Sequence, residues 1–144
     1  MSANPREPAA LQSGGGDTFA QVAALVRKTL ALPETEPIEP KQLFFYDLGF
    51  TSMDLLDLLF RIEQHFSIGI PEGTIYHLAR GEMPESEFAE DGVLSEAGRQ
   101  RLIALLQDSP PEIFPARIHA TTLPRYCTVA DFVRLVDHKL TTGQ

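Results

Sequence analysis

The amino-acid sequence predicts an all-α fold, namely a small helical bundle with an additional helical insertion before its last helix. Large apolar residues recur at steps of three and four in several segments, which is the spacing of one helix face. These segments begin at residues that commonly cap helices. No segment shows the alternation of apolar and polar residues that is typical of a half-buried strand.

The first helix is expected after a disordered N-terminal arm. Residues 1–16 contain two prolines, three consecutive glycines and few large apolar groups, so they cannot bury enough surface to offset the entropy of ordering. From Asp17, a suitable N-cap, apolar residues recur at helical spacing up to Leu30. Pro33 then stops the helix, because the residue before a proline avoids the α region.

The second helix follows a long loop. Residues 32–50 contain three prolines and three glutamates, and their apolar patch at 43–45 is expected to dock on the helices. The segment Ser52–Phe66 is the most regular helical pattern in the chain. Its apolar set is wider than one stripe, so more than one neighbour is expected to cover it. Gly69 and Pro71 end it.

The insertion is assigned to residues 72–126, where glycines and prolines interrupt the chain repeatedly. One helix is predicted inside it, from an N-cap at Ser95 to just before Asp108, and a short helical turn is expected at 73–78. Unlike a flexible linker, the insertion is rich in large apolar residues. We therefore expect it to be ordered.

The last helix is expected to begin after an N-cap at Thr128 and to end near Leu140, which leaves residues 141–144 as a flexible tail. The apolar residues of the insertion are expected to pack on this helix and on the helix at 52–66, because exposed they would form a patch that soluble monomers avoid.

Composition excludes several functional classes. The 144 residues suffice for one domain with a buried core, or for one domain with a large insertion. Twenty acidic and 12 basic residues give a net charge of −8, which argues against nucleic-acid binding and favours basic partners.

One cysteine, Cys127, excludes an internal disulfide, and we expect it to be a buried thiol. The four histidines lack metal-ligand spacing, so no metal site is expected. No 18-residue apolar run is present, so no membrane span is expected. The N-terminus lacks the apolar core of a signal peptide, so we expect a cytoplasmic protein. We also expect it to be a monomer.

The most informative segment runs from Asp47 to Leu55, with the sequence DLGFTSMDL. A glycine turn delivers the Ser52 hydroxyl to the start of an amphipathic helix, where free N–H groups and the helix dipole favour a phosphate. The residues alone leave two roles open for Ser52. It is either an N-cap, the commoner role of such a serine, or the attachment point of a phosphodiester.

The segment 47–71, DLGFTSMDLLDLLFRIEQHFSIGIP, resembles the attachment region of the acyl carrier protein family. In that family an Asp-x-Gly-x-x-Ser-Leu/Met motif opens the second helix, which ends in a Glu-x-x-Phe step and an Ile-Pro pair. Glu63 and Phe66 supply the step, and residues 70–71 supply the pair. The resemblance covers about residues 17–71 and 126–140, since the segment from Thr128 resembles the start of the family's last helix.

This resemblance implies a four-helix acyl carrier domain over residues 17–140, with the insertion at 72–126. It implies that phosphopantetheine is attached covalently to Ser52 and holds acyl groups as thioesters, for use by fatty-acid, polyketide or lipid-modifying enzymes. The chain itself would not be an enzyme. The implied partners are a phosphopantetheinyl transferase and acyl-transferring or acyl-modifying enzymes with basic docking patches. The residues expected to contact them are Asp47, Met53, Asp54, Asp57 and Glu63.

Two departures from the family pattern and two alternatives accompany this reading. Thr51 stands where the family often has an aspartate, and residues 72–126 stand where carriers have a short loop and a small helix. The acidic residues of the helix could be a solvated face only. The competing function is a helical interaction module whose serine is never modified. A hydrolase or a transferase is not favoured, because the sequence shows no nucleophile–base–acid set for catalysis.

Overall fold

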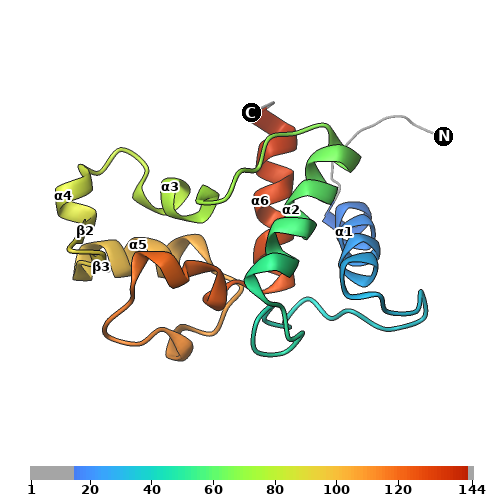
Figure 1. Cartoon of the computed structure of the whole chain (residues 1–144). Coiled ribbons are helices and arrows are strands. Elements are labelled where there is room, and N and C mark those ends of the chain that lie inside the picture. The colour runs from blue at the N-terminus through green and yellow to red at the C-terminus, as the bar shows by residue number, and fades with distance from the viewer. Residues whose placement is uncertain (1–14, 143–144) are drawn as a thin grey trace. The chain divides into compact units, whose positions relative to one another are not determined.

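The structure is a computed structural model that describes residues 15–142, and most of these residues are helical, as the sequence predicts. Within these bounds no helix is both long enough and apolar enough to cross a membrane. In chain order the elements are α1 (Gly15–Leu30), α2 (Ser52–Phe66), α3 (Thr74–Arg80), α4 (Glu85–Phe88), β2 (Ala89–Glu90), β3 (Val93–Leu94), α5 (Glu96–Leu105), the 3-10 helices η1 (Pro111–Ile113) and η2 (Ala120–Tyr126), and α6 (Val129–Thr142) (Figure 1).

The ends of the first and last helices differ from the prediction. α1 begins at Gly15, before the expected Asp17, and α6 continues to Thr142 instead of ending near Leu140. The predicted disordered arm otherwise comprises residues 1–14, and the predicted flexible tail otherwise comprises residues 143–144. Both ranges lie outside the described residues. Helix ends are hard to predict because the terminal turns lack internal hydrogen bonds.

The described chain divides into two compact units. Among the described residues, the first comprises 15–39, 50–70 and 132–142, and the second comprises 40–49 and 71–131. The predicted insertion therefore lies wholly within the second unit. That unit also includes residues 40–49 of the loop before α2 and the first turn of α6, neither of which was predicted to group with the insertion.

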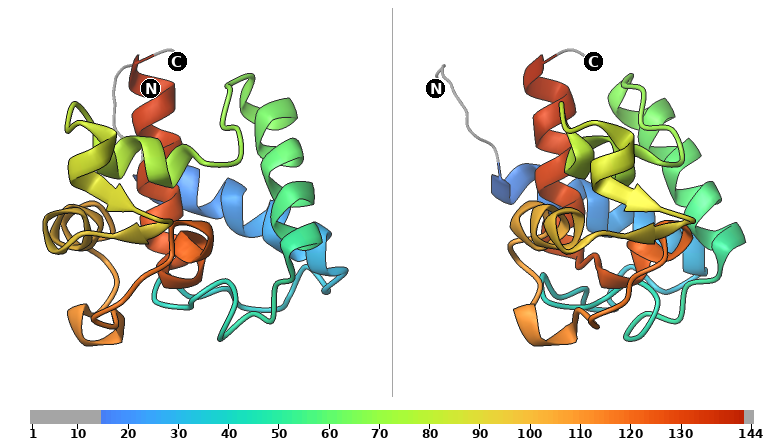
Figure 2. Two further views of the ribbon diagram at one scale, coloured as in Figure 1. Left: turned by 60° about the vertical axis from the view of Figure 1, so that its left-hand side comes forward. Right: turned by 90° about the vertical axis from the view of Figure 1, so that its left-hand side faces the viewer.

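The first unit is built around α1, which lies between α6 and α2 in the left view of Figure 2. The Thr18 hydroxyl of α1 donates a hydrogen bond to Asp137 of α6 at 2.7 Å. On the other side, Gln21 of α1 is hydrogen-bonded to His65 of α2 at 2.6 Å. The fully buried side chains of this unit include Val22, Val26, Leu58, Ile62 and Val136.

Helix α2 is covered less completely than predicted. Leu58 and Ile62 are fully buried, one turn apart. By contrast, Met53, Leu56 and Phe60 are 72%, 41% and 61% exposed. Their spacing of three and four residues places them on a separate stripe of the helix. The expectation that neighbours cover the whole apolar set of α2 was therefore wrong for this stripe.

The second unit contains a short hairpin that the sequence analysis missed. Strands β2 and β3 pair antiparallel, with Ala89 opposite Leu94 and Glu90 opposite Val93. The two residues between the strands, Asp91 and Gly92, have φ angles of 53° and 79°. Positive φ at both positions is characteristic of a type I′ turn, for which Asp-Gly is a favoured sequence. The strands have two residues each, so they are too short to show alternation.

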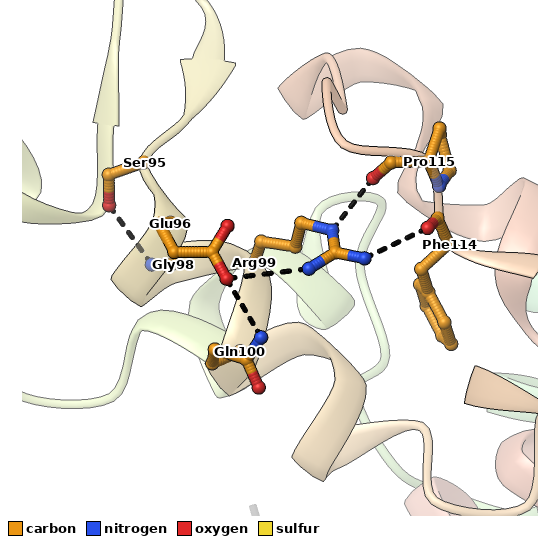
Figure 3. A network of polar contacts seen from close by, with 7 residues as sticks. All are labelled: Ser95, Glu96, Gly98, Arg99, Gln100, Phe114 and Pro115. Carbon is orange, nitrogen blue, oxygen red and sulfur yellow. Dashed lines mark hydrogen bonds and ion pairs between the residues drawn. The ribbon is translucent and has the colours of Figure 1, made fainter. Parts of the chain in front are cut away.

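Helix α5 holds the following loop in place (Figure 3). Its predicted N-cap, Ser95, accepts a hydrogen bond from the Gly98 amide at 3.0 Å. The Arg99 guanidinium donates to the carbonyl oxygens of Phe114 and Pro115 at 3.0 and 2.7 Å. One side chain thus fastens residues 114–115 to the helix.

The insertion has buried apolar side chains of its own, as expected for an ordered segment. Tyr76 packs edge-on against Phe88 with ring centroids 5.0 Å apart. Packing of the insertion on α2 and on the rest of α6 stays a prediction. The side chains of the insertion with 1% exposure or less are Phe88, Leu102, Leu106, Ile118 and Leu123.

Gly98 allows α4 and α5 to approach closely, and this contact can be tested. A Cβ atom at Gly98 would clash with the Phe88 carbonyl oxygen. Alanine is better than glycine inside a helix by about 1 kcal/mol, yet we expect Gly98→Ala to lower the free energy of unfolding by about 1–3 kcal/mol because of this clash. Urea denaturation followed by circular dichroism measures the change.

The matched control is Gly69→Ala, since no atom lies within 4 Å of a Cβ at Gly69. This variant is expected to be as stable as the wild type. A Gly98→Ala protein of unchanged stability would contradict the close contact.

Candidate functional site at the start of helix α2

The loop before α2 makes a compact turn around Asp47. Its carboxylate accepts a hydrogen bond from the Leu43 amide at 2.7 Å, and the amides of Asp47 and Leu48 both donate to the Leu43 carbonyl at 2.9 and 3.1 Å. Gly49 follows with a φ of 76°, a conformation that glycine adopts without strain. The sequence motif thus forms the glycine turn that was predicted.

Thr51 is the N-cap of α2. Its hydroxyl oxygen accepts a hydrogen bond from the Asp54 amide at 3.2 Å, and the Asp54 carboxylate accepts one from the Thr51 amide at 2.9 Å. This reciprocal pair is a capping box, in which two residues three apart satisfy each other's backbone donors. Of the two roles left open for Ser52, the structure assigns the cap to Thr51 instead.

Ser52 is the first residue of the helix and is exposed. Among the described residues its hydroxyl has no polar partner. The backbone N–H groups of Ser52 and Met53 belong to the first helical turn, whose donors find no carbonyl inside the helix. An exposed hydroxyl beside unpaired N–H groups at the positive end of a helix dipole suits a phosphate ester, so these residues fit a phosphopantetheine group.

Each acidic residue predicted to contact partners also has a local structural role. Asp54 completes the capping box, and Asp57 pairs with Arg61 at 3.2 Å, one turn further along α2. The Glu63 carboxylate accepts a hydrogen bond from the Ile70 amide at 2.9 Å and so holds the turn after α2. These roles were not predicted from the sequence, although the spacings of three for Thr51–Asp54 and four for Asp57–Arg61 indicate two of them.

The predicted site residues fall into three places. Met53, Asp54 and Asp57 share the first two turns of α2 with Ser52, and Met53 is 72% exposed. Glu63 lies near the other end of the same helix, while Asp47 lies in the loop that belongs to the second unit.

Cys127 is buried, as the sequence predicted, with 2% exposure. Burial raises the pKa of its thiol well above the ordinary value, and the nearby Asp131 carboxylate adds to this increase. A thiol with a raised pKa is a poor nucleophile at neutral pH. Over residues 15–142, no group of three or more His, Cys, Asp and Glu residues is arranged to hold a metal ion.

Comparisons with known proteins agree with this geometry. A family model described as "Phosphopantetheine attachment site" matches residues 20–80. The acyl carrier protein of Helicobacter hepaticus is 38% identical over 56 residues, which cover 39% of this chain and 72% of that protein. The chain belongs to the acyl carrier protein family.

Two further acyl carrier proteins are similar to this one, both named AcpXL. The protein of Brucella melitensis is 33% identical over 72 residues, covering 49% of this chain and 76% of that protein. The protein of Rhizobium meliloti is 39% identical over 54 residues, covering 38% of this chain and 56% of that protein. No solved structure shows a significant match.

Membership of the family identifies phosphopantetheine as the covalently attached prosthetic group of this carrier. Members of the family are carriers and not enzymes themselves, and they work with a phosphopantetheinyl transferase and with acyl-handling enzymes. The matched region ends at residue 80, so the hairpin and α5 lie beyond it.

The capping arrangement predicts that alanine substitution of two adjacent hydroxyl residues changes the free energy of unfolding by different amounts. Thr51→Ala removes the cap and should lower the free energy of unfolding by about 1 kcal/mol. Ser52→Ala removes a hydroxyl without a partner, so stability should stay within about 0.5 kcal/mol of the wild type. Denaturation of the two variants under the same conditions measures the difference. Equal losses would show that Ser52 shares the capping role.

Proposed function

We propose that Ser52 carries the phosphopantetheine arm and that this protein holds acyl groups as thioesters, with residues 17–140 as its carrier domain. The observation that supports this assignment most strongly is the free, exposed hydroxyl of Ser52 beside a threonine that already caps the helix. The bound group supplies the thiol on which acyl chains are held, while the protein supplies attachment and recognition.

The residues around Ser52 have separate tasks in this proposal. Thr51 and Asp54 fix the start of α2, so the serine is not needed for capping. The N–H groups of Ser52 and Met53 remain available to the phosphate oxygens, and the helix dipole favours the negative charge there.

We also propose that partner enzymes dock on the face of α2 next to Ser52. The Met53, Leu56 and Phe60 stripe is exposed, and Asp54 and Asp57 lie on the same helix. A partner with a basic patch around an apolar centre would complement both the charge and the exposed side chains. Asp47 and Glu63 complete the proposed contact set as outlying carboxylates.

Intact-mass measurement tests the attachment site. After incubation with coenzyme A and a phosphopantetheinyl transferase, the wild type should gain one phosphopantetheinyl group and Ser52→Ala should gain none. Ser86→Ala changes another exposed serine and should be loaded like the wild type. Loading of Ser52→Ala would contradict the assignment to Ser52. A wild type that is never loaded would favour the unmodified interaction module.

Charge reversal tests the docking face. Asp57→Lys should slow loading at low salt and weaken its salt dependence, because rim charges act mainly on the association rate. Its exposed pair with Arg61 is worth only about 0.3–0.5 kcal/mol, so folding should hardly change. Loading rates measured across a salt series give the comparison.

Glu34→Lys is the control, since it makes the same charge change at an exposed residue outside α2. If both variants load at the same rate at low salt, Asp57 has no specific part in docking. Asp54→Lys is a poorer probe because it also breaks the capping box.

A further inference from the structure

The loop that leads to Ser52 is fastened to the start of α6. Residues 40–49 contain no helix, and their order depends on backbone hydrogen bonds to residues 127–130, within the second unit. Phe44 is buried at 2% exposure, so the loop is anchored by packing as well. The backbone contacts are Phe44 N–H to the Cys127 carbonyl at 3.3 Å, Val129 N–H to the Gln42 carbonyl at 2.9 Å, Ala130 N–H to the Pro40 carbonyl at 2.9 Å, and a bridge between Leu43 and Thr128.

The start of α6 is in turn fastened to the insertion by one buried carboxylate. Asp131 is 1% exposed and accepts hydrogen bonds from the Thr128 amide at 3.1 Å, from the Asp108 amide at 2.8 Å and from the Ser109 hydroxyl. The Ser109 hydroxyl oxygen also lies 2.6 Å from the Tyr126 carbonyl oxygen, which is a second acceptor for its proton. The Asp131 amide donates back to the Thr128 hydroxyl at 3.1 Å, as in the capping box of α2. A buried carboxylate is costly unless several donors satisfy it, so this arrangement is sensitive to the loss of one donor.

A continuous series of contacts therefore connects the insertion to the loop before Ser52. Residues 108–109 follow α5, Asp131 holds them against the first turn of α6, and that turn holds residues 40–49. Asp47 and Gly49, which form the turn of the attachment motif, belong to this loop.

We propose that Ser109 and Asp131 are positioning residues for loading of the arm, through which the insertion keeps the loop before Ser52 in the conformation that the transferase binds. This inference rests on the proposed function of Ser52. When the contact with Ser109 is lost, a smaller fraction of the molecules holds the loop in this conformation. The apparent affinity for the transferase falls by the same fraction, while chemistry in the bound complex does not change.

The test compares two variants, each of which removes one buried hydroxyl that donates a hydrogen bond to an aspartate. Ser109→Ala acts in the second unit, and Thr18→Val removes the bond to Asp137 in the first unit. Two properties of the full chain are measured. The first is amide hydrogen exchange at Phe44, Val129 and Ala130. The second is the kinetics of loading by the transferase at saturating coenzyme A, as kcat and as KM for the carrier protein. Ser109→Ala should speed exchange at these amides and raise KM about three- to tenfold with unchanged kcat. Thr18→Val should lower the melting temperature without either effect.

A folded Ser109→Ala protein with wild-type exchange and KM would overturn the proposal, and so would equal effects in both variants. Should Ser109→Ala fail to fold, Asp131→Asn keeps the side-chain size and one acceptor oxygen, and the same two changes are expected. If the wild type is never loaded, the proposed function fails, and the exchange measurement alone still decides whether the insertion holds the loop.

Discussion

Every helix begins with backbone N–H groups that have no partner inside the helix. This protein satisfies that constraint in the same way at its two most important helix starts. A threonine precedes the helix and an aspartate follows three residues later, at Thr51 and Asp54 for α2 and at Thr128 and Asp131 for α6. The first pair fixes where α2 begins and hence where Ser52 stands. The second pair is buried and recruits other donors, so it also organises the second unit.

The capping role of Thr51 explains how this carrier differs from the family pattern while keeping Ser52, the proposed attachment residue. Aspartate, often found before the serine in the family, and threonine are both suitable N-caps. With threonine as the cap, Ser52 is the first residue of the helix, and its hydroxyl has no polar partner among the described residues. The substitution thus preserves the local geometry of the site while it removes one negative charge next to Ser52.

Much of the fold could be predicted from the sequence, because α1, α2, α5 and α6 show helical spacing. Suitable caps also stand before α2, α5 and α6, whereas the expected cap of α1, Asp17, lies inside that helix. The elements that escaped prediction depend on other kinds of information. The hairpin has strands too short for any periodicity, although the Asp91–Gly92 pair was a usable signal. The need for glycine at position 98 comes from the approach of Phe88, which no local pattern reveals.

The candidate site was predicted in outline but not in detail. The motif located Ser52 at the start of α2. Serine and threonine both serve as N-caps, with serine somewhat preferred, so the residue types alone favour Ser52 and only the structure assigns the cap to Thr51. Residues 40–49 group with the insertion through backbone hydrogen bonds between segments far apart in the chain. The pattern of side chains along the sequence does not predict such bonds.

In the docking that we propose on α2, the exposed stripe of Met53, Leu56 and Phe60 has a kinetic consequence. Three side chains on one helix face offer a small apolar contact, and small interfaces are typical of transient complexes. A small contact gives a weak complex, and affinity differences between related complexes arise mostly from dissociation rates. A contact of this size therefore favours fast dissociation and short residence times. A carrier that passes its cargo from one enzyme to the next gains from such brief encounters, because each partner must release it before the following one can bind.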